Sequence, residues 1–246
     1  MGKVLAVMRA KEFSPGSVEK DEAVMLAVIS RLQAKGYETK VVYDEQVSDV
    51  CGTFDFILSM ARRPETLSWL QSQDVKCVNA PEGVASCRRS VLQRIMRECN
   101  VPMPPKSGND GYWLKRGDAS GSMTDGDVVY VADADALQAS VEEFRRRGID
   151  DYVVSTHVKG SEMKFYGVLH AGFFRSYSLT EQRPGTVPGL REAAERLAAA
   201  VGVEVYGGDC IVKDDGSFCL IDFNDWPSFS LCRDEAAEAI VSLFDR

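Results

Sequence analysis

The sequence is poor in the residues on which zinc sites, disulfide frameworks and nucleophilic triads depend. Only two of its 246 residues are histidines, and its seven cysteines include no Cys-x-x-Cys pair. Zinc sites use mainly cysteine and histidine ligands, and a Ser-His-Asp triad needs a histidine base. An odd number of scattered cysteines is more typical of free thiols in a reducing compartment than of disulfides. These shortages leave little material for zinc chemistry or for a triad.

Long hydrophobic runs and an excess of positive charge are also missing. No apolar run approaches the roughly 20 residues that a membrane helix needs, and the opening MGKVLAVMRAKEF lacks the apolar core of a signal peptide. Ala6 stands where N-myristoylation requires Ser or Thr. The net charge of −8 argues against nucleic acid or an anionic membrane as a partner. We therefore expect a cytoplasmic protein with neither nucleic acid nor a membrane as a partner, and the sequence leaves a homodimer open.

The first 80 residues alternate between short apolar segments and helical patterns. Apolar residues at helical spacing predict a helix at 18–35, which Gly36 stops, and a second at 64–71, which begins with proline. Strands are predicted at 4–8, 39–43, 54–60 and 75–78. Because strands that alternate with helices form parallel sheets, residues 1–80 are expected to fold as a Rossmann-like lobe. This lobe has no GxGxxG, so nothing in it alone indicates a nucleotide site.

The rest of the chain mixes helices with strands that pair as hairpins, so the predicted fold class is α/β with α+β character. Helices are predicted at 83–99, 134–147, 190–201 and 233–244. Strands are predicted at 112–115, 128–131, 152–158, 168–170, 173–177, 206–212 and 218–223.

The last predicted hairpin, within 205–229, carries an oxygen-rich site. Asp222 and Asn224 are two residues apart and so point to one face of their strand, and Asp209 on the partner strand can join them. Neighbouring strand residues are apolar, which makes unpaired charges costly there. Two carboxylates and an amide suit Mg²⁺, which takes its other ligands from phosphate and water. The alternative is a solvent-facing hairpin with acids in its turn, which we apply to Asp214 and Asp215.

A glycine- and serine-rich segment follows the predicted strand that ends in Lys115. The segment 117–122, GDASGS, includes Ser120 and Gly121. Backbone N–H groups of such a loop can reach phosphate oxygens because glycine has no side chain to obstruct the approach. A solvated hairpin loop would have the same composition, so the adjacent lysine is what favours a phosphate site.

Two further pairs of charged residues are candidates for binding. Glu162 and Lys164 lie on one strand face, where a cross-strand ion pair is the alternative to ligand binding. Arg88 and Arg89 lie in a predicted helix, where a solvated helix face is the alternative.

The order of these segments resembles the ATP-grasp superfamily, above all its carboxylate–amine ligases of the ribosomal-protein-modification and glutathione-synthetase type. The resemblance rests on Asp222-x-Asn224 before Trp226-Pro227, on a basic helix with a proline-rich exit, and on the strand that ends in Lys115. It implies an ATP-grasp fold behind a Rossmann-like lobe, with ATP and Mg²⁺ as cofactors. The implied domains are 1–80, 81–157 and 158–246.

The resemblance also assigns roles to individual residues. The implied metal ligands are Asp209, Asp222 and Asn224, and the implied catalytic residues are Arg175 and Lys164. The implied nucleotide contacts are Arg89, Lys115, Ser120, Gly121, the hinge residues Ser155, Thr156, His157 and Val158, the ribose-binding Glu162, and Lys164. The polar loop 179–188 is expected to be a substrate lid, with Arg183 as a substrate contact.

The sequence departs from the family pattern at two of these places. Arg88-Arg89 stands where the family usually has Asp-Lys, and arginine keeps the charge but changes the geometry of a phosphate contact. Ser155-Thr156 stands where the family often has Gln-Glu or Glu-Lys, so recognition of adenine there would depend on the backbone.

Three functions remain open at this point. The first is an ATP- and Mg²⁺-dependent ligase that joins a small-molecule carboxylate to an amine or thiol through an acyl phosphate. The second is a kinase similar to the inositol-phosphate kinases of this fold, favoured by Met163-Lys164-Phe165-Tyr166 and by Gly208-Asp209. The third is a non-catalytic nucleotide-binding module.

Overall fold

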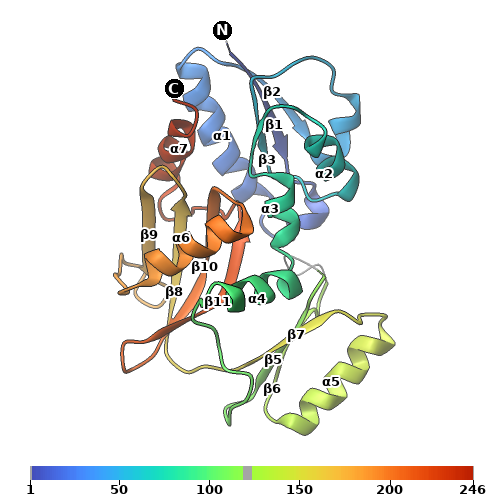
Figure 1. Cartoon of the computed structure of the whole chain (residues 1–246), viewed down its shortest axis with the longest axis vertical. Helices are drawn as coiled ribbons and strands as arrows, with labels where there is room; N and C mark the ends of the chain where they lie inside the picture. The colour runs from blue at the N-terminus through green and yellow to red at the C-terminus, as the bar shows by residue number, and fades with distance from the viewer. Residues whose placement is uncertain (1, 119–123, 246) are drawn as a thin grey trace.

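Three sheets follow one another along the long axis of the molecule (Figure 1). The computed structural model describes residues 2–118 and 124–245. The predicted phosphate contacts Ser120 and Gly121 lie outside the described residues.

The N-terminal lobe is a parallel sheet with the strand order β2-β1-β3-β4. Its elements are β1 (Lys3–Met8), the 3-10 helix η1 (Lys11–Phe13), α1 (Val18–Ala34), β2 (Glu38–Tyr43), the 3-10 helix η2 (Asp44–Asp49), β3 (Phe56–Ser59), α2 (Pro64–Gln71) and β4 (Lys76–Val78). Strand β1 is buried on both faces, as central strands of parallel sheets are. Val4 and Ala6 pack against α1, and Leu5 and Val7 pack on the opposite face with residues of α2 and η2. The predicted parallel sheet is confirmed.

The central sheet is antiparallel and has the order β11-β10-β8-β9. Its strands are β8 (Ser161–Val168), β9 (Phe173–Ser178), β10 (Val205–Val212) and β11 (Phe218–Asp225). Neighbouring residues of β8 face opposite sides, so Phe165 packs with α6 (Leu190–Val201) and Tyr166 packs with α7 (Arg233–Ser242). Helix α7 also contacts α1, so the chain returns to the N-terminal lobe and both termini lie at the same end (Figure 1).

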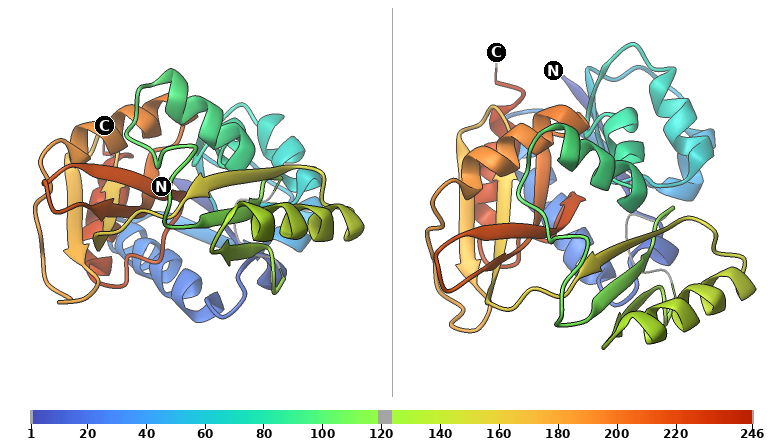
Figure 2. Two further views of the ribbon diagram at one scale, coloured as in Figure 1. Left: turned by 90° about the horizontal axis from the view of Figure 1, so that it is seen from below. Right: turned by 60° about the horizontal axis from the view of Figure 1, so that its bottom comes forward.

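The third sheet is small and carries its own core. It consists of β5 (Tyr112–Arg116), β6 (Val128–Val131) and β7 (Tyr152–Thr156) in the antiparallel order β6-β5-β7. Helix α5 (Ala134–Arg146) buries Val141 and Phe144 against Leu114 of β5. Asp133 caps this helix by accepting a hydrogen bond from the Ala136 N–H at 2.8 Å. Figure 2 shows the unit set to one side of the central sheet. Its apolar cluster is separate from the cores of the other two sheets.

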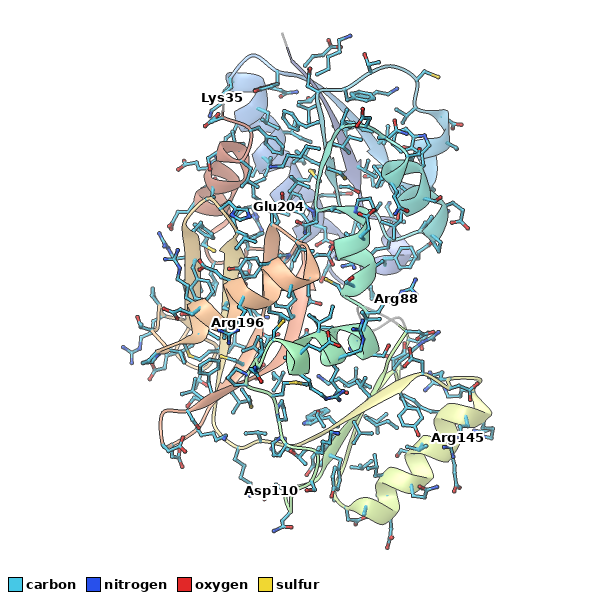
Figure 3. All side chains as sticks on the ribbon, viewed as in Figure 1. Lys35, Arg88, Asp110, Arg145, Arg196 and Glu204 are labelled. Atoms are coloured by element: carbon cyan, nitrogen blue, oxygen red, sulfur yellow. The ribbon has the colours of Figure 1, made fainter. Side chains whose placement is uncertain are left out.

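The predicted helix at 83–99 is instead two helices, α3 (Pro81–Ser86) and α4 (Arg89–Glu98). Arg88 between them has an extended backbone, with φ −60° and ψ 136°, and Figure 3 labels it at this junction. Helix α3 is held against the end of α6, since a Cβ atom on Gly83 would clash with the Gly202 carbonyl. Helix α4 packs its buried Leu92, Ile95 and Met96 with α6 and also contacts the small sheet, where Ser90 Oγ donates to Asp151 Oδ2 at 2.8 Å. The chain bends at Arg88, between the two helices.

The seven cysteines are all free thiols, and four of them are buried. This agrees with the free thiols expected from their odd number and scattered positions. Within residues 2–118 and 124–245, no helix is both long and apolar enough to cross a membrane.

Candidate active site

The predicted metal ligands lie together on one face of the central sheet. Strand register places Asp209 of β10 directly opposite Asp222 of β11, and Asn224 follows two residues later on the same face. The Asn224 side-chain amide donates to Asp222 Oδ2 at 2.8 Å. On the other neighbour of β10, Lys164 stands opposite Asp209, and its Nζ lies 2.6 Å from Asp209 Oδ1. Three strands therefore bring the predicted metal ligands and one predicted catalytic lysine into a single cluster.

A β-bulge in β11 connects this cluster to the small sheet. The strand register shifts after Asp209, so that Cys210 pairs with Leu220 and Ile221 is the additional residue. A bulged residue is left out of the ladder, and bulges are frequent beside active sites. The Ile221 carbonyl accepts a hydrogen bond from Lys115 Nζ at 3.1 Å. The bulge thus places Lys115, the lysine of β5 that is predicted to bind phosphate, beside the acidic cluster.

The charges of the cluster influence one another strongly. Burial raises the pKa of Asp209 against the opposing effect of Lys164, and the nearby charges of Asp222 and Glu162 raise it further. Burial alone would lower the pKa of Lys164, but Asp209 and Asp222 outweigh it and the pKa is raised. Burial lowers the pKa of Lys115, partly offset by Asp222. Carboxylates that are costly to keep ionised would be stabilised by a cation.

The donor set of this cluster fits Mg²⁺. Like charges that are directly opposite across two strands repel each other, so Asp209 and Asp222 gain from a shared cation. The described part of the chain contains no group of three or more His, Cys, Asp or Glu side chains that could hold a metal. The ligand set is therefore limited to two carboxylates and the Asn224 amide oxygen. Mg²⁺ is suited to so few protein ligands because it keeps water and binds substrate phosphate.

A cavity of about 60 Å³ separates the small sheet from the central sheet. Lys115, Arg89 and Asp222 line its charged end, and its apolar wall consists of Leu92, Met96, Met103, Val153 and Leu220. Arg89 Nη1 donates to the Arg116 carbonyl at 3.2 Å, which holds the arginine beside β5. Apolar walls beside cationic groups fit a nucleotide base and its phosphates. Ligand pockets usually measure roughly 300–1,000 Å³, so a nucleotide would require the small sheet to move outward.

The predicted hinge residues divide into two groups. Ser155 lines the small cavity. The N–H groups of Thr156 and His157 donate to the carbonyls of Pro105 and Gly111 at 3.2 and 2.8 Å. The nucleotide contacts predicted for Ser155, Thr156 and His157, through backbone N–H or carbonyl groups, stay predictions. His157 Nδ1 accepts from Trp113 Nε1 at 3.2 Å, which gives the ring a structural role. The contact predicted for Val158 remains a prediction.

Arg175 and Arg183 do not join the cluster. Arg175 lies on β9 and pairs with Glu235 of α7, where its Nε donates to Glu235 Oε2 at 3.0 Å. Arg183 pairs with Glu181 in the exposed loop after β9. The catalytic role predicted for Arg175 stays a prediction; in the structure Glu235 of α7, the helix that covers this face of the sheet, supplies its counterion.

Sequence reasoning missed a second cavity, of about 240 Å³, between the N-terminal lobe and the central sheet. Arg9 follows β1 and Arg62 follows β3, and both line it together with Lys164 and Asn224. In the order β2-β1-β3-β4, the chain goes from β1 to β2 on one side of β1 and then to β3 on its other side, so the switch point lies between β1 and β3. Ligands of open α/β sheets bind at such switch points, outside the carboxyl ends of the strands. Arginines directly after two predicted strands were the signal that could have found this cavity.

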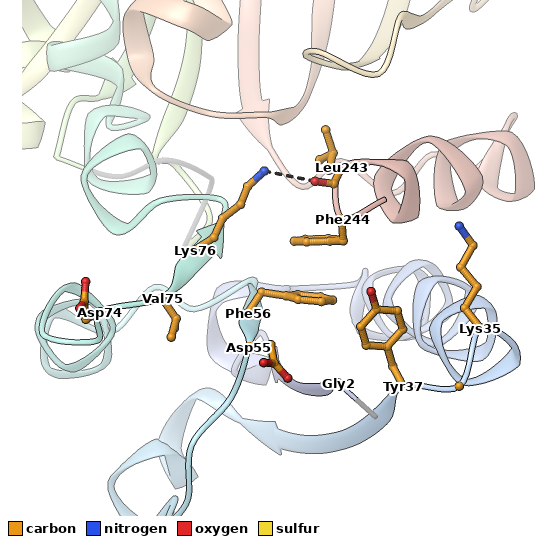
Figure 4. Close-up of a pocket in the computed structure, with 11 residues that line it drawn as sticks. Gly2, Lys35, Tyr37, Asp55, Phe56, Asp74, Val75, Lys76, Leu243 and Phe244 are labelled. Carbon is orange, nitrogen blue, oxygen red and sulfur yellow. Dashed lines mark hydrogen bonds between the residues drawn. The ribbon is translucent and has the colours of Figure 1, made fainter. Parts of the chain in front are cut away.

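A third groove, of about 940 Å³, lies at the amino ends of the same strands (Figure 4). Phe56 stacks on Phe244 there with ring centroids 3.7 Å apart, and Lys76 Nζ lies 3.5 Å from the Leu243 carbonyl. These contacts attach the end of the chain to the lobe. The groove lies at the opposite edge of the sheet from Arg9, so it does not belong to the cluster described above.

Comparisons with solved structures identify the fold. The D-alanine–D-alanine ligase from Bacillus anthracis has a TM-score of 0.69 at 15% identity, covering 100% of this chain and 95% of that one. The corresponding ligase from Coxiella burnetii has a TM-score of 0.70 at 12% identity, with coverages of 99% and 96%. A RimK domain ATP-grasp protein from Sphaerobacter thermophilus has a TM-score of 0.72 at 17% identity, with coverages of 99% and 100%. No family model and no curated protein matches the sequence. The chain has the ATP-grasp fold, complete with the lobe that precedes it in these ligases.

Proposed function

We propose that the protein is an ATP- and Mg²⁺-dependent ligase that joins a small-molecule carboxylate to an amine or thiol and forms ADP and phosphate. The observation that carries the proposal is the gathering of Asp209, Asp222, Asn224, Lys164 and Lys115 where the small and central sheets meet. The fold is shared with ligases, one of them solved in complex with ATP. We also propose that the protein is cytoplasmic and that it forms a homodimer.

The reaction consists of two displacements. A carboxylate oxygen attacks the γ-phosphorus, the bond to the β–γ bridging oxygen breaks, and ADP leaves. The amine or thiol then attacks the acyl carbon, phosphate leaves and the nucleophile loses its proton. Bound Mg²⁺ would draw negative charge from the transferred phosphoryl group. Positioning and charge stabilisation account for such a reaction without a protein nucleophile, in keeping with the two histidines of the chain.

The residues of the cluster divide this work. Asp209, Asp222 and Asn224 would hold the cation. Lys115 reaches the cluster from β5 and would exchange the Ile221 carbonyl for a phosphate oxygen when nucleotide enters. Lys164, paired with Asp209 and lining the 240 Å³ cavity, would face both the phosphate and the acceptor.

The inositol-phosphate kinase alternative has less support. A polyphosphate needs many cationic groups without counterions. In the 240 Å³ cavity, Arg9 pairs with Asp21 and Arg62 pairs with Asp225. Arg9, Arg62 and Lys164 are each paired with one carboxylate, which leaves too little net positive charge for a substrate that carries several phosphates.

Product analysis separates the three functions. The full chain is incubated with ATP, Mg²⁺ and a panel of carboxylic acids, amines, thiols and inositol phosphates, and ADP and phosphate are both measured. A ligase forms both in equal amounts and only when both acceptors are present. A kinase forms ADP without phosphate, and a non-catalytic module forms neither, so either result would refute the proposal.

A further inference from the structure

The 240 Å³ cavity has a polar composition that the metal cluster does not explain. Its lining includes Lys164 and Asn224, which belong to the cluster, and also Arg9 and Arg62 with their partners Asp21 and Asp225. Both arginines are mostly shielded from solvent, with side chains 12% and 9% exposed. Placing two guanidinium groups in such a site costs desolvation energy, so a specific role is expected for them.

Each arginine is held in place by an ion pair with a carboxylate. Arg9 Nη1 lies 3.2 Å from Asp21 Oδ2, and its Nη2 donates to the Trp226 carbonyl at 3.2 Å. Arg62 Nη2 lies 2.6 Å from Asp225 Oδ1, and the Asp225 side chain is 0% exposed. Asp21 and Asp225 line the same cavity, so a ligand there meets arginines whose orientation these ion pairs fix. Such support fixes the orientation of a guanidinium for an incoming anion.

Two buried donors at the cavity lack an acceptor. Among the described residues, neither Arg9 Nε nor the indole Nε1 of Trp226 has a hydrogen-bond partner. Buried polar groups are nearly always paired, so each exception calls for an explanation such as an absent ligand. Trp226 also has φ 44°, a strained value for a bulky residue, of the kind that clusters at ligand sites. A ligand that supplies oxygen atoms would satisfy both donors, while Asp225 Oδ2 of the same cavity is a buried acceptor without a partner.

The electrostatics of the arginines point the same way. Burial lowers the pKa of Arg9 and the nearby charge of Arg62 lowers it further, while Asp21 raises it. The two guanidinium groups thus repel each other, and an anion between them would relieve the repulsion. Guanidinium groups bind carboxylate through paired N–H···O contacts.

We propose that this cavity binds the acceptor substrate and that the substrate is a small dicarboxylate, with its non-reacting carboxylate on Arg9 and Arg62. This inference rests on the proposed function, because the second carboxylate is the one at Lys164 and Asn224 that receives the phosphoryl group. A volume of 240 Å³ is the share of about eight liquid waters. The substrate is accordingly an acid of roughly eight to ten non-hydrogen atoms, such as a four- or five-carbon dicarboxylate with or without an amino group.

The first test measures binding, which needs no turnover. The full chain is titrated calorimetrically with succinate, glutarate, aspartate and glutamate, and with monocarboxylates of matched length, with Mg²⁺ and a non-hydrolysable ATP analogue present. At least one dicarboxylate should bind roughly 10- to 150-fold more tightly than its matched monocarboxylate, the range of one charge-assisted hydrogen-bonded contact. Equal binding of both series, or binding of neither, would overturn the inference, and so would tighter binding of inorganic phosphate.

The second test assigns the contact to the arginines. Arg9→Lys and Arg62→Lys keep the charge but lose the paired N–H groups, so each should weaken dicarboxylate binding at least 10-fold and leave monocarboxylate binding unchanged. Arg63→Lys is the matched control, because Arg63 pairs with Glu12 and does not line the cavity. Unchanged affinity in both test variants would overturn the assignment. If a variant fails to fold, the ligand series on the unaltered protein still decides.

The outcomes distinguish this inference from the proposed function. Dicarboxylate binding without formation of ADP and phosphate would leave the cavity assigned and refute the ligase. Ligation of monocarboxylates alone would support the ligase and refute the dicarboxylate.

Discussion

Replacing Asp222 by asparagine separates the metal role of this residue from any structural one. The substitution keeps the shape and an acceptor oxygen for the Asn224 amide, which now donates to Asp222 Oδ2 at 2.8 Å. It removes the like charge opposite Asp209, and a cross-strand charge pair of this kind is worth about 0.2–1 kcal/mol. It also removes a favourable charge near Lys115. Because the two effects oppose each other, the fold should tolerate the change.

The expected stability change follows from these magnitudes. One kcal/mol corresponds to a shift of about 2–4 °C in the melting temperature of a chain of this size. In metal-free buffer Asp222→Asn should therefore melt within about 4 °C of the unaltered protein. With Mg²⁺ at ten times its dissociation constant, linkage adds about 1.4 kcal/mol, or about 3–6 °C, to the unaltered protein. The variant should gain little, because one of the two carboxylate ligands is gone.

Activity should fall far more than stability. Removing one group that stabilises transition-state charge typically costs about 100- to 1,000-fold in rate, so ATP turnover of Asp222→Asn should fall at least 100-fold. Asp214→Asn is the control, since Asp214 lies in the turn of the same hairpin, is exposed and is away from the cluster. Melting by calorimetry with and without Mg²⁺, and ADP release, are the measurements. Normal turnover in Asp222→Asn, or an equal Mg²⁺ response, would remove Asp222 from the metal site.

Three further substitutions test separate parts of the structure. Burial lowers the pKa of Lys115, so this lysine loses its charge as the pH rises, and kcat/KM for ATP should fall at a pH below the usual pKa of lysine. Lys115→Arg should move this fall to higher pH, and identical pH profiles would contradict the prediction. Arg175→Gln should keep full turnover and lose at most about 1 kcal/mol of stability, since its ion pair is half exposed; a large loss of turnover would support its catalytic role. Gly83→Ala should destabilise the fold by about 1–3 kcal/mol through the clash with Gly202, measured by urea unfolding against Ser86→Ala; equal stability would contradict the close packing.

Local periodicity was sufficient to predict most elements and the acidic cluster. The spacing of Asp222 and Asn224 requires a shared strand face, and a tight turn in the hairpin brings Asp209 to the partner strand. These are relations between near neighbours in the chain, so they survive folding unchanged. The same holds for α1 and α6, whose buried residues repeat at helical spacing.

Features that depend on distant partners could not be predicted in this way. The bulge at Ile221 changes the strand register by one residue, and the alternation of polar and apolar residues in the strand does not predict it. The extended backbone at Arg88, which separates α3 from α4, is likewise not indicated by the apolar spacing of residues 83–99. Arg175 was placed correctly on its strand, but its counterion Glu235 comes from the last helix, whose packing on that face is tertiary.

The cavity that Arg9 and Arg62 line shows why the order of strands in the sheet matters more than residue spacing for this part of the structure. Arg9 and Arg62 each follow a predicted strand, and a single charged residue at the end of a strand is ordinary. They become a pair only because β3 lies beside β1, which turns two separate loop residues into neighbours at the switch point. Asp225 then reaches Arg62 because β11 extends past its predicted end and carries the carboxylate across from the central sheet. The ion pair between Arg62 and Asp225 therefore joins the N-terminal lobe to the central sheet at this cavity.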